Sequence, residues 1–184
     1  MKKTLLIVLA VIAFVLLYGG VVYNSLVNKN EGIDNQWAQV ESQYQRRFDL
    51  IPNLVNSVKG AMKQEQEVFG KLADARTKYG SAATVNEKAA AATEVESALS
   101  RLLVVMENYP QLKSSDTVIT LMSQLEGTEN RISVERKRFN DTTQEYNLIV
   151  KRFPSKLVAV MFGFGEKNYF DSAAGAENAP NVSF

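Results

Sequence analysis

Apolar residues form a continuous block at the start of the chain. Leu5 to Leu17 is an unbroken run of thirteen apolar residues, and no charged residue occurs over 4–23. Twenty helical residues at about 1.5 Å each give roughly 30 Å, enough to cross the hydrocarbon core of a bilayer. Tyr18 and Tyr23 lie where interfacial aromatic residues are expected. The pattern predicts a short segment over 1–3 and a transmembrane anchor over 4–23, whose partner is membrane lipid.

A cleaved signal peptide is the alternative, because it shares the positive start and the apolar region. No small-x-small cleavage site ends the run, since Tyr18-Gly19-Gly20-Val21 matches poorly. We therefore expect a retained, single-pass anchor. Lys2 and Lys3 precede the anchor, and Lys29 is the nearest cation after it. This charge difference favours a cytoplasmic N-terminus and a bundle on the extracytoplasmic side of the cell membrane.

Residues 24–33 form a polar juxtamembrane linker, which is either a hinge or a helical continuation of the anchor. After this linker, the spacing of the apolar residues becomes that of an α-helix. Apolar residues recur at spacings of three, four and seven, as in helices that face a core. Proline removes a backbone donor and clashes with the preceding turn, so the first helix should bend at Pro52. The predicted elements are helices over 34–79, 87–108 and 115–153, a short element over 155–163, and a disordered tail over 171–184.

These elements predict an all-α fold in which an N-terminal transmembrane helix precedes an up-and-down antiparallel helical bundle. Three long amphipathic helices joined by short loops bury their apolar stripes by packing against one another. The bundle domain should cover residues 34–170, with the short element packed onto the three long helices.

Composition excludes several kinds of chemistry. The 184 residues contain no cysteine and no histidine, so thiol nucleophiles, disulfides, thiolate zinc sites and imidazole bases are all absent. Two of the 21 Lys and Arg residues precede the anchor, which leaves 19 against 20 acidic residues. The chain after the anchor therefore has a net charge of −1, without the excess of basic residues that nucleic-acid-binding domains carry. We predict no catalytic residue, cofactor, metal site or identifiable small-molecule substrate.

Polar residues interrupt the apolar stripes and are the candidate site residues. One interpretation is that they fix the register between helices, and another is that they are solvated where the stripe drifts. A third is a catalytic or metal-binding carboxylate set with Glu65, Glu107 and Glu129 as donors, although four-helix di-metal sites also use histidine. We favour a structural polar network made of Arg46, Arg47, Asp49, Pro52, Asn53, Glu65, Glu107, Asn108, Pro110, Glu129, Asn130, Arg136 and Asn140.

These residues also carry a resemblance to the LemA family. The similar stretches include Arg46-Arg47-Phe48-Asp49-Leu50-Ile51-Pro52-Asn53-Leu54-Val55, Glu107-Asn108-Tyr109-Pro110-Gln111-Leu112-Lys113, Glu129-Asn130-Arg131-Ile132 and Phe153-Pro154. Ala61 and Phe139 stand where the family often has tyrosine. The resemblance implies a bacterial envelope protein with one membrane helix, a helical bundle and no established activity. Family descriptions that place the short N-terminus outside keep the opposite orientation open.

The functional hypothesis is a membrane-anchored binding or scaffold module without catalytic activity. Its partner contact would involve exposed parts of the Arg46–Val55 motif or the apolar stretch over 157–164. A self-assembling structural membrane protein is the first alternative, and a carboxylate-dependent enzyme is the second. Both the scaffold and the self-assembly hypotheses require protein contacts, with another protein in the first and with further copies of the chain in the second.

Overall fold

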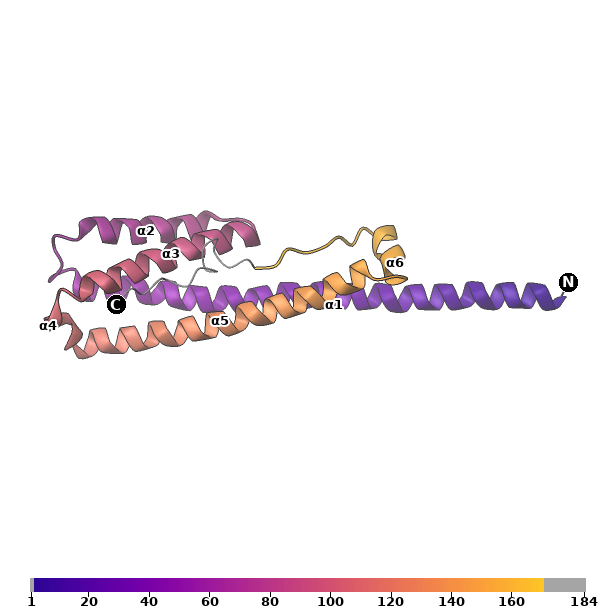
Figure 1. Ribbon diagram of the computed structural model, residues 1–184, viewed down its shortest axis with the longest axis horizontal. Coiled ribbons are helices and arrows are strands. Elements are labelled where there is room, and N and C mark those ends of the chain that lie inside the picture. The colour runs from indigo at the N-terminus through magenta and orange to yellow at the C-terminus, as the bar shows by residue number, and fades with distance from the viewer. Residues whose placement is uncertain (1, 171–184) are drawn as a thin grey trace, which may run out of the picture. The chain divides into compact units, whose positions relative to one another are not determined.

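The computed structural model describes residues 2–170, all of whose regular elements are helices (Figure 1). This confirms the all-α prediction. The tail predicted over 171–184 lies outside the described residues. The helices are α1 (Lys2–Val58), α2 (Gln66–Ser81), α3 (Val85–Met106), α4 (Pro110–Lys113), α5 (Asp116–Lys151) and α6 (Ser155–Met161).

The first helix is continuous with the apolar segment and ends earlier than predicted. Residues 24–33 are helical, which is the second of the two forms expected for this segment. The helix contains Pro52 and ends at Val58, whereas the prediction extended it to residue 79. Tight turns follow, in which the Ala61 N–H and the Met62 N–H both donate to the Val58 carbonyl at 3.0 Å. The apolar spacing continues across this turn, which explains why periodicity alone predicted one helix.

The third helix begins with a capping box that the sequence prediction overlooked. The Thr84 side chain accepts from the Glu87 N–H at 3.2 Å, and the Glu87 carboxylate accepts from the Thr84 N–H at 3.0 Å. These two bonds satisfy backbone donors that a helix start leaves without intrahelical partners. The helix therefore starts at Val85, two residues before the predicted Glu87.

The chain divides into two compact units. Among the described residues, unit 1 comprises 2–39 and 137–169, and unit 2 comprises 40–136 with Phe170. In unit 1, α1 packs against α5, with the Trp37 and Phe139 rings 5.5 Å apart. Its buried apolar residues include Val22, Leu26, Ile33, Phe139, Tyr146, Val150 and Ala159.

Unit 2 is built from the end of α1, from α2, α3 and α4, and from the first part of α5. Helices α2 and α3 lie side by side (Figure 1). The Phe48 and Tyr79 rings are 4.5 Å apart, and the Tyr44 and Tyr79 rings are 5.5 Å apart. The buried apolar stripes include Val40, Tyr44, Phe48, Ile51 and Leu54 of α1, Leu72 and Tyr79 of α2, Val95, Leu99 and Leu102 of α3, and Val118, Leu125 and Ile132 of α5.

The first part of α1 has no such packing. It is long and apolar enough to cross a membrane, and only 6% of its most apolar 18-residue stretch is buried. Large apolar side chains from Leu5 to Leu17 are exposed around the helix. A helix that is apolar on all sides is stable in lipid or in a protein core, and residues 2–170 form no core around this segment.

Candidate functional site

A cluster of paired charges lies inside unit 2, where three helices meet. The Arg47 side chain on α1 is 8% exposed and forms an ion pair with Glu129 of α5. Its guanidinium also lies 3.8 Å from a carboxylate oxygen of Glu96 on α3. A buried guanidinium is costly unless its charge and its N–H groups are matched. Arg47 therefore connects all three helices through two carboxylates.

A second arginine enters the same cluster from α5. Arg136 Nε donates to the Tyr44 hydroxyl at 2.8 Å, and Arg136 Nη2 pairs with the Glu96 carboxylate. The Tyr44 hydroxyl itself donates to Glu96 Oε1 at 3.4 Å. The Arg136 guanidinium also lies over the Tyr44 ring and over the Phe170 ring, 5.4 and 4.6 Å from their centroids. Glu96 is thus the acceptor that both arginines share.

We call Arg47, Glu96, Glu129, Arg136 and Tyr44 the charged cluster. Burial raises the pKa of the Tyr44 hydroxyl above its usual value, and the neighbouring Arg136 only partly opposes this. Burial would lower the pKa of Arg136, but Tyr44 and Glu96 outweigh burial and raise it. At neutral pH the Tyr44 phenol is therefore neutral and the Arg136 guanidinium is charged. Two cations then face two carboxylates, so the cluster is electrically balanced.

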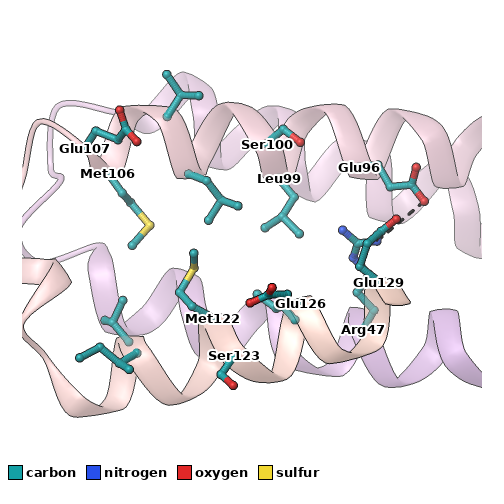
Figure 2. A pocket seen from close by; sticks show the side chains of 15 residues that line it. Arg47, Glu96, Leu99, Ser100, Met106, Glu107, Met122, Ser123, Glu126 and Glu129 are labelled. Carbon is teal, nitrogen blue, oxygen red and sulfur yellow. Dashed lines mark hydrogen bonds and ion pairs between the residues drawn. The ribbon is translucent and has the colours of Figure 1, made fainter. Parts of the chain in front are cut away.

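A cleft adjoins the charged cluster between α3 and α5 (Figure 2). Its volume is about 890 Å³. Met106 and Met122 point toward each other across it, and Arg47, Glu96 and Glu129 gather together at its other end. The remaining lining residues are largely apolar, apart from carboxylates and serines: Leu99, Ser100, Leu103, Val104, Glu107, Val118, Ile119, Ser123, Leu125 and Glu126.

The cleft combines an apolar lining with carboxylates. Apolar and methionine side chains adapt to apolar partners, while carboxylates at the rim favour cationic groups. Within residues 2–170, no three carboxylates approach closely enough to hold a metal ion. Two of the three carboxylates considered for a catalytic set, Glu107 and Glu129, do line the cleft. Glu65 instead accepts a hydrogen bond from the Tyr109 hydroxyl at 3.4 Å.

Comparison with known proteins identifies the family. The LemA family model matches residues 36–184, which is most of the chain. The chain belongs to the LemA family. It is also 26% identical over 174 residues to the magnetosome proteins MamQ 1 and MamQ 2 of Paramagnetospirillum magneticum. Magnetosome protein MamQ of Magnetospirillum gryphiswaldense is 25% identical over the same length. Each match covers 80% of this chain but only 64% of the relative.

The LemA-family motif residues divide between the charged cluster and the surface. Arg47, Glu129 and Arg136 come together, while Arg46, Asp49 and Asn53 are exposed on α1. The Asp49 carboxylate accepts from the Gln45 amide at 2.9 Å. Among the other predicted residues, Pro52 is half-buried, Glu107, Asn108, Pro110 and Asn130 are exposed, and Asn140 is half-buried in unit 1.

Sequence reasoning missed two members of the charged cluster in this LemA-family chain. Tyr44 was assigned to the apolar stripe, and its ring does lie there. Glu96 is not among the predicted polar residues, and the adjacent Val95 is a buried apolar residue of α3. However, Glu96 precedes Leu99 by three residues and Leu103 by seven, so it shares their helix face. An acidic residue at that spacing is the signal that would have found it.

Proposed function

We propose that this chain is a single-pass membrane protein of the bacterial envelope whose helical bundle binds or scaffolds other proteins without catalysis. The exposed apolar segment of α1 carries the proposal. Side chains such as Phe14 and Leu17 are 69% and 73% exposed, on a helix of spanning length. Exposing that much apolar surface to water is unfavourable, whereas a bilayer covers it on every side. Membership of the LemA family supports the helical bundle that follows.

The cleft between α3 and α5 is the proposed protein-binding surface. Exposed apolar side chains stand at it, including Val104 at 66% and Ile119 at 51%. Glu107 and Glu126 add negative charge beside them. An amphipathic segment with cationic residues would bury its apolar face there and place its cations near the carboxylates.

Site-specific photo-crosslinking tests this surface. A photoreactive amino acid replaces Val104 at the cleft, and a matched variant replaces Val134 of α5, which is exposed but does not line the cleft. Irradiation of cells should give a crosslinked protein from position 104 and none from position 134. Equal products from both positions, or none from position 104, would contradict the cleft as the binding surface.

Self-assembly is the alternative, and the same products distinguish it. A crosslinked species made of two copies of this 20.5 kDa chain would favour a self-assembling structural protein. A product containing a different polypeptide would favour the scaffold. Native mass spectrometry of the chain in lipid provides an independent check, because self-assembly requires oligomers there and the scaffold proposal does not.

We also propose that the bundle lies on the extracytoplasmic side, on the basis of Lys2 and Lys3. Because the chain has no cysteine, Ser81→Cys introduces a single reactive thiol at an exposed position of the bundle. A membrane-impermeant maleimide should label this thiol in spheroplasts as strongly as in lysed cells. Labelling only after lysis would place the bundle in the cytoplasm and leave the anchor proposal intact.

A further inference from the structure

The short helix α6 and its flanks present an apolar surface that no part of the described chain covers. Leu157, Val160 and Met161 follow the spacing of one helix face. Their exposed fractions are 62%, 71% and 75%, and Phe153 and Phe162 on either side are 82% and 56% exposed. Monomeric soluble proteins rarely expose large apolar side chains contiguously, and such patches mark contact surfaces.

The conformation of this surface is defined by contacts to α5. Ser155 Oγ donates to the carbonyl oxygens of Ile149 and Arg152, at 2.7 and 2.8 Å. The Asn147 amide bonds both backbone groups of Lys167, donating to its carbonyl at 2.8 Å and accepting from its N–H at 2.9 Å. These bonds hold the chain before and after α6, so its apolar residues are exposed by a fixed structure.

The position of α6 along α1 identifies what covers this surface. The Phe162 and Phe164 rings lie 4.8 and 5.8 Å from the ring of Tyr23, at the end of the uncharged segment. Side chains of α6 and residues 14–24 of α1 together line an apolar cavity of about 810 Å³. Helix α6 therefore lies beside the second half of the uncharged segment, which is roughly 15 Å long at about 1.5 Å per residue.

We propose that α6, with Phe153 and Phe162, inserts into the lipid interface of the bilayer that α1 crosses. The inference rests on the proposed membrane anchor, because the α6 surface is continuous with the apolar surface of α1. Exposed cations at Arg152 and Lys156 lie beside the apolar residues, where lipid phosphates would attract them. The apolar stretch noted in the sequence is thus assigned to lipid and not to a protein partner.

Depth-dependent fluorescence quenching tests the insertion in the full chain. Single cysteines at Phe14, Met161 and Val104 carry an environment-sensitive dye, and the chain has no other cysteine. The labelled proteins are reconstituted in phosphatidylcholine and phosphatidylglycerol vesicles with brominated lipids. Leu157→Cys repeats the α6 measurement at a second position, and circular dichroism verifies that each variant is folded.

The Met161 dye should lose most of its fluorescence with bromines near the headgroup and less with bromines near the chain ends. The Phe14 dye, near the middle of the span, should show the reverse order, and the Val104 dye should respond only to iodide in water. Quenching of Phe14 without quenching of Met161 and Leu157 would overturn the insertion of α6 alone. An α6 dye shielded from both bromine and iodide would also overturn it, since protein would then cover the surface. Loss of bromine quenching at Phe14 as well would overturn the membrane anchor itself.

Discussion

Among the described residues, unit 2 buries a charged side chain, whereas unit 1 buries neutral polar groups. In the core of unit 2, Arg47 is buried and bound to carboxylates that are only partly shielded from water. In unit 1 the buried polar residues are neutral, and Asn147 and Ser155 bond to backbone groups near α6. A charge in a core has a strong requirement for a charged partner, whereas an amide can be satisfied by the backbone. The charged cluster therefore connects three helices, while the neutral groups hold one segment in place.

The largest expected effect is that of Arg47→Leu. Removing the cation leaves Glu129 without its ion-pair partner and leaves Glu96 with Arg136 alone, and breaking a fully buried pair costs about 3–5 kcal/mol. Because these carboxylates are 24% and 43% exposed, we expect a loss of about 2–3 kcal/mol after this solvent screening. Urea denaturation in detergent, followed by circular dichroism, measures it.

Two controls separate charge from packing in that experiment. Arg46→Leu changes the exposed neighbouring arginine and should shift stability by less than about 0.5 kcal/mol. The double variant Arg47→Leu/Glu129→Leu should recover part of the lost stability, because it also removes the carboxylate that Arg47→Leu leaves unpaired. Equal losses in the free energy of unfolding for Arg46→Leu and Arg47→Leu would contradict a larger contribution from the buried arginine than from the exposed one.

Two buried tyrosines of unit 2, Tyr44 and Tyr79, differ in the hydrogen bonds of their hydroxyl groups. The Tyr44 hydroxyl bonds Arg136 and Glu96, whereas the Tyr79 hydroxyl is buried without a hydrogen-bond partner among the described residues. We expect Tyr44→Phe to cost about 1–2 kcal/mol at pH 7 because charged partners lose a bond. Tyr79→Phe should be neutral or slightly stabilising in the same urea experiment. A larger loss for Tyr79→Phe would contradict the assigned bonds.

Alkaline pH adds a second test of these tyrosines. Burial raises the pKa of both Tyr44 and Tyr79 in the folded state above the ordinary value of 10.0. Above that pH the unfolded state releases protons that the folded state retains, so the free energy of unfolding falls. Stability is fully present below about pH 10 and falls by about 1.4 kcal/mol per pH unit for each such tyrosine. Tyr79→Phe should reduce this slope, which denaturation at a series of pH values would measure.

A smaller and more local effect is expected in unit 1. Asn147→Ala removes two hydrogen bonds to the half-buried Lys167 backbone, where water can replace part of the loss. We expect a cost of about 1 kcal/mol and faster amide exchange at Lys167. Hydrogen exchange with mass spectrometry resolves this segment, and Gln144→Ala at an exposed position of α5 is the matched control. Faster exchange throughout unit 1 would mean that Asn147 supports the whole unit.

The exposed pair of Lys29 and Glu145 should have the smallest effect. Their side chains are 42% and 60% exposed. Lys29→Ala should change stability by less than about 0.5 kcal/mol, because solvent and salt screen surface pairs. A loss comparable to that of Arg47→Leu in the same denaturation experiment would contradict the difference between surface and core charges.

The parts of the fold that depend on period could be predicted from the sequence. The N-terminal apolar segment, helices α3 and α5, and the buried position of Arg47 all follow from the spacing of apolar residues. The end of α1 at Val58 could not be predicted from this spacing, because Met62, Val68 and Leu72 keep a helical spacing across a turn. The helix continues through Pro52, as predicted, and ends at Val58 instead of residue 79. Propensity is a weak guide where tertiary packing decides.

The charged cluster was predictable only in part. Arg47, Glu129 and Arg136 stand out as charges within apolar rows, and each of them enters the cluster. Which carboxylate joins the two arginines depends on how α3 is rotated and shifted against α1 and α5. Spacing places Glu96 on the same helix face as Leu99 but contains no information on that arrangement, so it could not identify Glu96 as the shared partner.

The intact mass of the chain in carbonate-washed membranes tests whether the bundle is anchored in the membrane by the N-terminal segment of α1. A protein anchored through the start of α1 resists extraction by sodium carbonate and keeps its N-terminal segment. We predict that the membrane pellet contains the full chain of 20.5 kDa. Recovery of the full chain in the soluble fraction, or of a shorter chain that lacks the apolar segment, would contradict the membrane-anchored bundle.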